Sequence, residues 1–172
     1  LGAPVLAQNS HGQISYASLF RGGSVDISSL SDLPTLPGAK TEVSRLSEEV
    51  GAKNSLLLTG TEITEPAIRS LDFKTFSFVT FATHGLTSGE IAGLSEPALV
   101  FTPPNQQSLE DDGLLTASEI AAMNIPADWV ILSACNSGGG QNASSPTYSG
   151  LAKAFRLAGS RSLLLSHWPV RD

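Results

Sequence analysis

The chain of 172 residues contains one cysteine, Cys135, and this scarcity excludes an internal disulfide. Disulfide frameworks are typical of oxidising compartments, so we expect a reducing one, with the cytoplasm as the default. Without a disulfide partner, Cys135 must be judged on its own chemistry. It is either a small apolar core residue or a thiolate nucleophile.

Basic residues are also few, ten Lys and Arg against sixteen Asp and Glu, and the net charge is −6. Nucleic-acid binding depends mainly on cations that contact phosphates, so this balance argues against nucleic acid as a direct partner and mildly favours a basic one. No apolar run approaches the roughly 20 residues that a membrane helix needs. Leu1–Ala7 is too short for a signal peptide and lacks a basic start. We therefore expect no membrane partner.

The hydrophobic fraction of 41% and the charged fraction of 15% are typical of a folded globular domain. The length fits one domain with its own core. The chain begins inside an apolar segment without a methionine, which predicts that it is an excised fragment.

Helical and strand-like segments alternate along most of the chain. Leu1–Ala7 is expected to end a strand, and residues 8–37 to form an irregular excursion. The expected helices include one with Val43, Leu46 and Val50 on its core face, then one capped by Thr64. The further helices are Leu114–Met123, with a Thr116–Glu119 capping box, and Ser149–Leu157. The expected strands are Ser55–Thr59, the run that ends at His84, Ala98–Phe101, Trp129–Ala134 and Arg161–Leu165.

This alternation predicts an α/β fold with a mostly parallel sheet and helices on both faces. The strands read as near-continuous apolar runs, which predicts burial on both faces. Asp111-Asp112-Gly113 could be an acid pair, but a turn before a helix start is the better interpretation. Residues 136–147 are rich in Gly, Ser and Asn and are expected to form a mobile loop.

Two of the apolar runs stop at reactive side chains. FSFVTFAT leads to His84 and Gly85, and WVILSA leads to Cys135, 51 positions further on. Ligands of an open parallel sheet bind beyond the carboxyl ends of its strands. If the two strands are neighbours, about 4.8 Å apart, imidazole and sulfur can meet. The sequence therefore predicts a Cys135 nucleophile with His84 as its acid and base.

An acyl-transfer site of this kind also needs donors for the oxyanion, and the backbone N–H groups of Gly85 and Cys135 are the candidates. A purely structural role for both residues remains an alternative, since a lone Cys that ends an apolar strand is often a packed core residue and a lone His is often a structural hydrogen-bonding residue. Three other chemistries are less well supported. Gly138–Ala143 matches G-x-G-x-x-A without an immediate helix, no G-x-S-x-G elbow occurs, and the three His residues and Cys135 lack metal-ligand spacing. No cofactor is therefore expected.

Several blocks of the sequence resemble the CHAT domain, a caspase-like family of cysteine peptidases associated with tetratricopeptide repeats. These blocks are, in order, LPGA (36–39), FATHG (81–85), DGLLTASEI (112–120), LSAC (132–135) and LLSHW (164–168) with Asp172. The resemblance covers most of the chain and is weakest over residues 8–33. The caspase run Q-A-C-x-G is not matched, because Ser133-Ala134-Cys135-Asn136 stands here.

The resemblance implies a caspase-like three-layer sandwich, truncated at both ends, and a cysteine endopeptidase that cleaves a protein substrate. It implies His84 as general acid and base, Cys135 as nucleophile, and a substrate pocket walled by Ser166, Trp168 and Asp172. It also implies regulation by a tetratricopeptide-repeat region or another protein partner. The alternative is a catalytically silent caspase-like scaffold.

Overall fold

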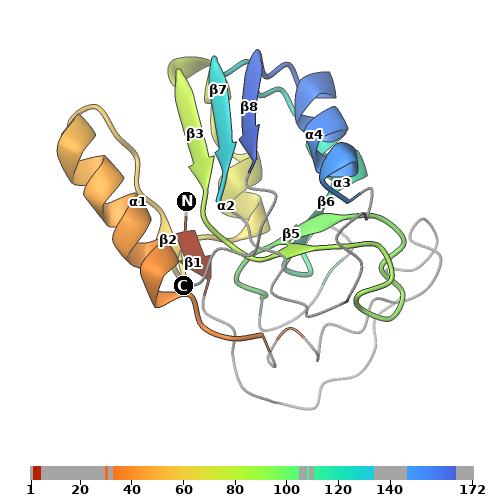
Figure 1. Cartoon of the computed structure of the whole chain (residues 1–172). Helices are drawn as coiled ribbons and strands as arrows, with labels where there is room; N and C mark the ends of the chain where they lie inside the picture. Colours follow the sequence, from red (N-terminus) through yellow and green to blue (C-terminus); the bar gives the residue numbers. More distant parts are fainter. Residues whose placement is uncertain are drawn as a thin grey trace.

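The structure is a computed structural model that describes residues 2–4, 30, 33–104, 108, 111–133 and 147–165 (Figure 1). Its elements, in chain order, are β1 (Gly2–Pro4), α1 (Pro37–Val50), β2 (Thr59–Gly60), α2 (Glu65–Arg69), the short 3-10 helix η2 (Phe73–Thr75), β3 (Phe78–Phe81), β4 (Gly85–Leu86), β5 (Ala98–Val100), β6 (Leu114–Thr116), α3 (Ala117–Ala122), β7 (Trp129–Leu132), α4 (Thr147–Leu157) and β8 (Ser162–Leu165). The alternation expected from the sequence is present, so the α/β class is confirmed.

The main strands run parallel. β3, β7 and β8 are hydrogen-bonded in that order, and β1 pairs with β2. A parallel bridge between Gly2 and Ala82 joins the two groups at the end of β3. The strand order is therefore β2-β1-β3-β7-β8, and the carboxyl ends of the strands share one edge.

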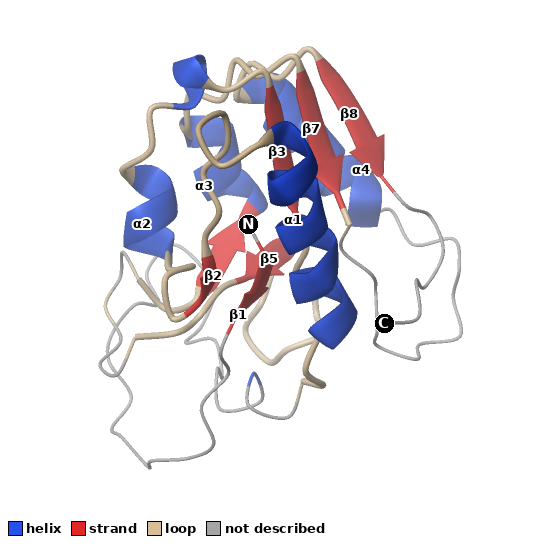
Figure 2. Ribbon diagram, turned by 90° about the vertical axis from the view of Figure 1, so that its left-hand side faces the viewer, coloured by secondary structure: helices blue, strands red, loops and turns tan. Residues whose placement is uncertain are grey.

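Helices lie on both faces of this sheet. Phe81 of β3 packs in the main core with residues of α2, α3 and α4, including Ile68, Ile120 and Phe155. The next residue, Ala82, packs instead with Val43 of α1, because successive side chains of a strand point to opposite faces. Figure 2 shows α1 alone in front of the sheet and α4 behind it. Right-handed crossovers explain the division, since β1 to β2 runs in the opposite direction from β3 to β7 to β8.

The prediction that these strands are buried on both faces is wrong for β3 and β7. Phe78 is 65% exposed and Trp129 is 43% exposed, whereas Val79 and Val130 are buried. The reason is that α1 lies over β1 and the end of β3, so it does not cover the outer strands. The sequence of a continuously apolar strand does not show which face is exposed, because polar and apolar residues do not alternate in it.

Helix α1 also differs from its sequence prediction. It begins at Pro37, inside the expected excursion, because proline is tolerated in the first helical turn. Its buried residues are Ala39 and Val43, while Leu46 and Val50 are about half exposed. The helix ends at Val50 with Gly51 as its C-cap, at φ of 89°. Among the described residues, none of the helices has the length and apolar character needed to cross a membrane.

Two further element boundaries are corrected. The strand expected at Ser55–Thr59 is only Thr59–Gly60, and the helix expected at Leu114–Met123 begins at Ala117 because Leu114–Thr116 forms β6. The capping box places the true helix start, since Thr116 and Glu119 each bond the backbone of the other. β6 joins β4 and β5 in an antiparallel sheet that the chain inserts directly after His84.

Candidate functional site

His84 lies just beyond β3 at the carboxyl edge of the parallel sheet, and it is 2% exposed. Its backbone is held by β5, because the N–H of Val100 donates to the His84 carbonyl at 2.9 Å. The Thr83 hydroxyl donates to the Val100 carbonyl. Gly85 then begins β4 and pairs with Leu99. The antiparallel sheet therefore fixes the histidine at the sheet edge.

The imidazole of His84 contacts the main chain just before α1. Its Nε2 lies 2.7 Å from the carbonyl oxygen of Pro34, 50 positions earlier. A carbonyl oxygen only accepts hydrogen bonds, so Nε2 carries the proton. In the neutral ring Nδ1 is then the nitrogen with the lone pair, and it is the one able to accept a proton. Pro34 could not be identified from the sequence, because the contact is made by its main-chain carbonyl, a group that every residue carries.

The strand that leads to Cys135 is the direct neighbour of β3. The register pairs Phe81 with Leu132, and the N–H of Ser133 donates to the Phe81 carbonyl at 2.8 Å. His84 follows Phe81 by three positions, and Cys135 follows Leu132 by three positions. The expected adjacency of the two strands is confirmed. The predicted site residues Cys135, Ser166, Trp168 and Asp172 lie outside the described part of the chain. Most of the excursion expected at residues 8–37 and of the loop expected at residues 136–147 does so too, and Thr147 begins α4 instead.

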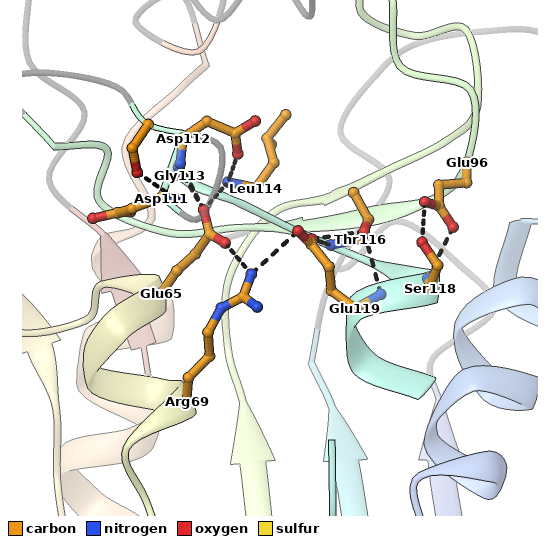
Figure 3. A network of polar contacts seen from close by, with 11 residues as sticks. Glu65, Arg69, Glu96, Asp111, Asp112, Gly113, Leu114, Thr116, Ser118 and Glu119 are labelled. Atoms are coloured by element: carbon orange, nitrogen blue, oxygen red, sulfur yellow. Dashed lines mark hydrogen bonds and ion pairs between the residues drawn. The ribbon is translucent and has the colours of Figure 1, made fainter. Parts of the chain in front are cut away.

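A buried polar network that the sequence analysis did not predict supports the antiparallel sheet (Figure 3). The Glu65 carboxylate accepts three backbone N–H groups, from Asp112 at 2.9 Å, Gly113 at 2.8 Å and Leu114 at 3.1 Å. Its other oxygen accepts from Arg69 at 2.8 Å. Arg69 also lies 3.2 Å from the Glu119 carboxylate of α3. One carboxylate thus binds α2, the turn before β6 and, through Arg69, α3.

Burial sets the acid–base properties of this network. Glu65 is fully buried, and desolvation raises its pKa from 4.5 to about 7, although the hydrogen bonds from Arg69 and from the Asp112 N–H oppose the rise. Burial raises the pKa of Asp111 as well, and the nearby Glu65 carboxylate raises it further. Asp112-Gly113 forms a bend with Gly113 at φ of 83°, but this bend leads into β6 and not into the helix start expected from the sequence.

The network reaches the candidate site through strand pairing. Leu114, which donates to Glu65, pairs with Val100 of β5, and Val100 donates to His84. Glu65 looked from the sequence like an ordinary acid in a first helical turn. Its N–H donors are 47 to 49 positions away, so no local pattern marks it. The network is a support for the site rather than part of its chemistry.

In the described part of the chain, no three His, Cys, Asp or Glu side chains lie close enough together to hold a metal ion.

One of three comparisons with known proteins identifies a family. No curated protein and no solved structure matches the chain. A family model for the CHAT domain matches residues 5–172, which is nearly the whole sequence. The blocks around His84 and before Cys135 lie within this match. The chain therefore belongs to the CHAT domain family.

Proposed function

We propose that this protein is a cysteine endopeptidase that works through His84 and Cys135. The observation that carries the proposal is the parallel register of β3 and β7, in which Phe81 pairs with Leu132 and each reactive residue follows three positions later. Equal offsets from a paired position favour emergence at the same sheet edge. Membership of the CHAT family, which is related to caspase-like cysteine peptidases, supports the same reading, with a caspase-like three-layer sandwich as its fold.

In the proposed reaction, His84 takes the proton of the Cys135 thiol, and the thiolate attacks the carbonyl carbon of a peptide bond and forms a tetrahedral oxyanion. The C–N bond then breaks, and His84 gives a proton to the leaving amine. A water molecule hydrolyses the thioester and returns the proton to His84. Because Nε2 faces the Pro34 carbonyl oxygen, we propose that Nδ1 takes and gives the proton in this reaction.

The remaining parts of the site are also proposals. The N–H groups of Gly85 and Cys135 would bind the oxyanion, and Ser166, Trp168 and Asp172 would wall the pocket for the residue before the cut. An acid in this pocket would favour Arg or Lys. The partners we propose are a protein substrate and a regulatory protein of the tetratricopeptide-repeat type, with no cofactor.

Labelling by a peptidyl acyloxymethylketone tests the proposal, because this probe reacts with a cysteine that a neighbouring acid–base group activates. We expect stoichiometric labelling of Cys135, none in Cys135→Ala, and a rate reduced about a hundredfold or more in His84→Ala. His84→Gln serves as a further variant that keeps a polar side chain at this position.

A Cys135 thiol that reacts no faster than a free thiol in folded protein, with or without His84, would contradict the proposal. That outcome favours a catalytically silent scaffold. Cleavage of a peptide library varied at the residue before the cut then tests the pocket. Indifference to Arg and Lys, or a preference that survives Asp172→Asn, would remove Asp172 from it.

A further inference from the structure

Both sides of the proposed site contact α1 or the segment just before it. The Pro34 carbonyl, three positions before α1, contacts His84. On the side of β7, the hydroxyl of Ser133 donates to the Glu42 carboxylate of α1 at 2.9 Å, across 91 positions of sequence. Ser133 is the last described residue before Cys135, which follows two positions later.

We propose that Glu42 is a positioning residue for the peptidase reaction. It acts through its hydrogen bond to Ser133, which fixes the end of β7 and so sets the Cys135 thiol relative to His84. This inference rests on the function proposed above and adds to it a residue that the sequence did not single out.

The end of β7 is restrained in two directions. The Ser133 N–H donates to Phe81 of β3 at 2.8 Å, which fixes the main chain within the sheet. The Ser133 hydroxyl bonds to Glu42 above the sheet, which fixes the strand end against α1. The acceptor is a carboxylate, and hydrogen bonds to charged acceptors are about twice as strong as neutral ones. The two bonds together leave the strand end little freedom just before the thiol.

Helix α1 is a firm support for this bond. Val43, the neighbour of Glu42, is buried against Ala82 at the end of β3. α1 also lies so close to β1 that a Cβ atom on Gly2 would come within 2.8 Å of the Val43 side chain. Glu42 therefore reaches Ser133 from a helix that is packed on the strand carrying His84. A single helix would therefore hold the imidazole and the thiol at a fixed distance and orientation, as proton transfer between them requires.

The plain alternative is that the bond only attaches α1 to the sheet. Kinetics separate the two roles, because attachment alone changes thermal stability without changing the reaction of correctly folded protein. The inactivation rate constant kinact of the acyloxymethylketone probe measures the alignment of thiol and imidazole, and KI measures probe binding. The variants are Glu42→Ala, Glu42→Gln and Ser133→Ala, with Glu49→Ala as control. Glu49 lies two helical turns along the same side of α1, so this control removes the same charge.

We expect Glu42→Ala and Ser133→Ala to lower kinact about tenfold or more with KI changed less than about twofold. The double variant should react no more slowly than the slower single variant, because both remove the same bond. Glu42→Gln keeps an oxygen acceptor and should restore kinact to within about threefold of the parent. Glu49→Ala should react like the parent protein.

Equal kinact in Glu42→Ala, Ser133→Ala and the parent would overturn the inference and leave the proposed function standing, provided that Cys135→Ala remains unlabelled and His84→Ala remains slow. A Glu42→Gln variant as slow as Glu42→Ala would also overturn the hydrogen bond as the cause. If Glu42→Ala fails to fold, Ser133→Ala decides, since it removes only a hydroxyl. If the Cys135 thiol of the parent protein reacts no faster than a free thiol, the proposed function itself is contradicted. The labelling experiment described under the proposed function detects that outcome separately.

Discussion

The Nε2 atom of His84 lies 2.7 Å from the carbonyl oxygen of Pro34, so a main-chain atom fixes the tautomer of the only described residue of the proposed dyad. Proline restricts its own φ to about −65° and so helps to aim this carbonyl. Pro34→Gly should free it and lower kinact of the acyloxymethylketone probe about threefold to tenfold. Pro37→Ala, in the first turn of α1, is the matched control and should keep the parent rate. Equal kinact values in Pro34→Gly and Pro37→Ala would show that the restricted φ of Pro34 is not required to orient His84.

The buried Glu65 network should contribute strongly to stability. Glu65→Gln gives a poorer acceptor to three backbone N–H groups and turns an NH2 donor toward Arg69, which can itself only donate. We expect a loss of about 3 kcal/mol in the free energy of unfolding, measured by urea denaturation. Glu48→Gln, which changes an exposed glutamate of α1, should alter it by less than about 0.5 kcal/mol. Similar values for the two variants would contradict the role given to Glu65.

The same residue makes stability depend on pH in a definite direction. The folded pKa of Glu65 is about 7 against an ordinary value of 4.5, so between these values the folded protein holds a proton that the unfolded chain has released. The contribution of this titration is fully present below pH 4.5 and is lost as the pH rises through 7. The difference in unfolding free energy between the parent and Glu65→Gln should therefore fall between pH 5 and pH 8. A difference that rises over this range would mean that the folded pKa is lowered.

Gly113 should tolerate no side chain. Its φ is 83°, and a Cβ atom there would come within 2.9 Å of the Cα and Cβ atoms of Pro103. Gly89 has a similar φ of 79° with nothing within 4 Å, so Gly89→Ala isolates the conformational cost. We expect a loss of about 1–2 kcal/mol for Gly89→Ala, and clearly more for Gly113→Ala because the clash adds to the strained φ. Equal losses in thermal or urea unfolding would show that the turn before β6 can move away from Pro103.

The main core should be sensitive to the size of one aromatic side chain. Phe155 of α4 is fully buried, and its ring centroid lies 5.5 Å from that of Phe81 in β3. Phe155→Ala should cost about 3–5 kcal/mol, because it leaves a cavity between α4 and the sheet. Leu157 on the same helix is 66% exposed, and Leu157→Ala should cost less than about 0.5 kcal/mol. Calorimetric melting of the two variants checks the contrast.

Local patterns in the sequence were reliable wherever the structure depends on neighbours along the chain. The Thr64 cap and the Thr116–Glu119 capping box are both confirmed. These features involve residues a few positions apart, so composition and spacing determine them. The exposure of Leu46 and Val50 was not predictable in this way, because it depends on which part of the sheet α1 covers.

By itself, the sequence determined the order of helices and strands, the family, and the two residues proposed to react. Periodicity and caps encode the helices and strands over short distances along the chain, whereas the sequence blocks around His84 and Cys135 indicate the family. The tertiary structure alone decided that Pro34 holds His84, that Glu42 holds Ser133, and that Glu65 organises the turn before β6. The physical reason is that these bonds join positions 47 to 91 residues apart. Only strand register and helix packing bring such partners within hydrogen-bonding distance.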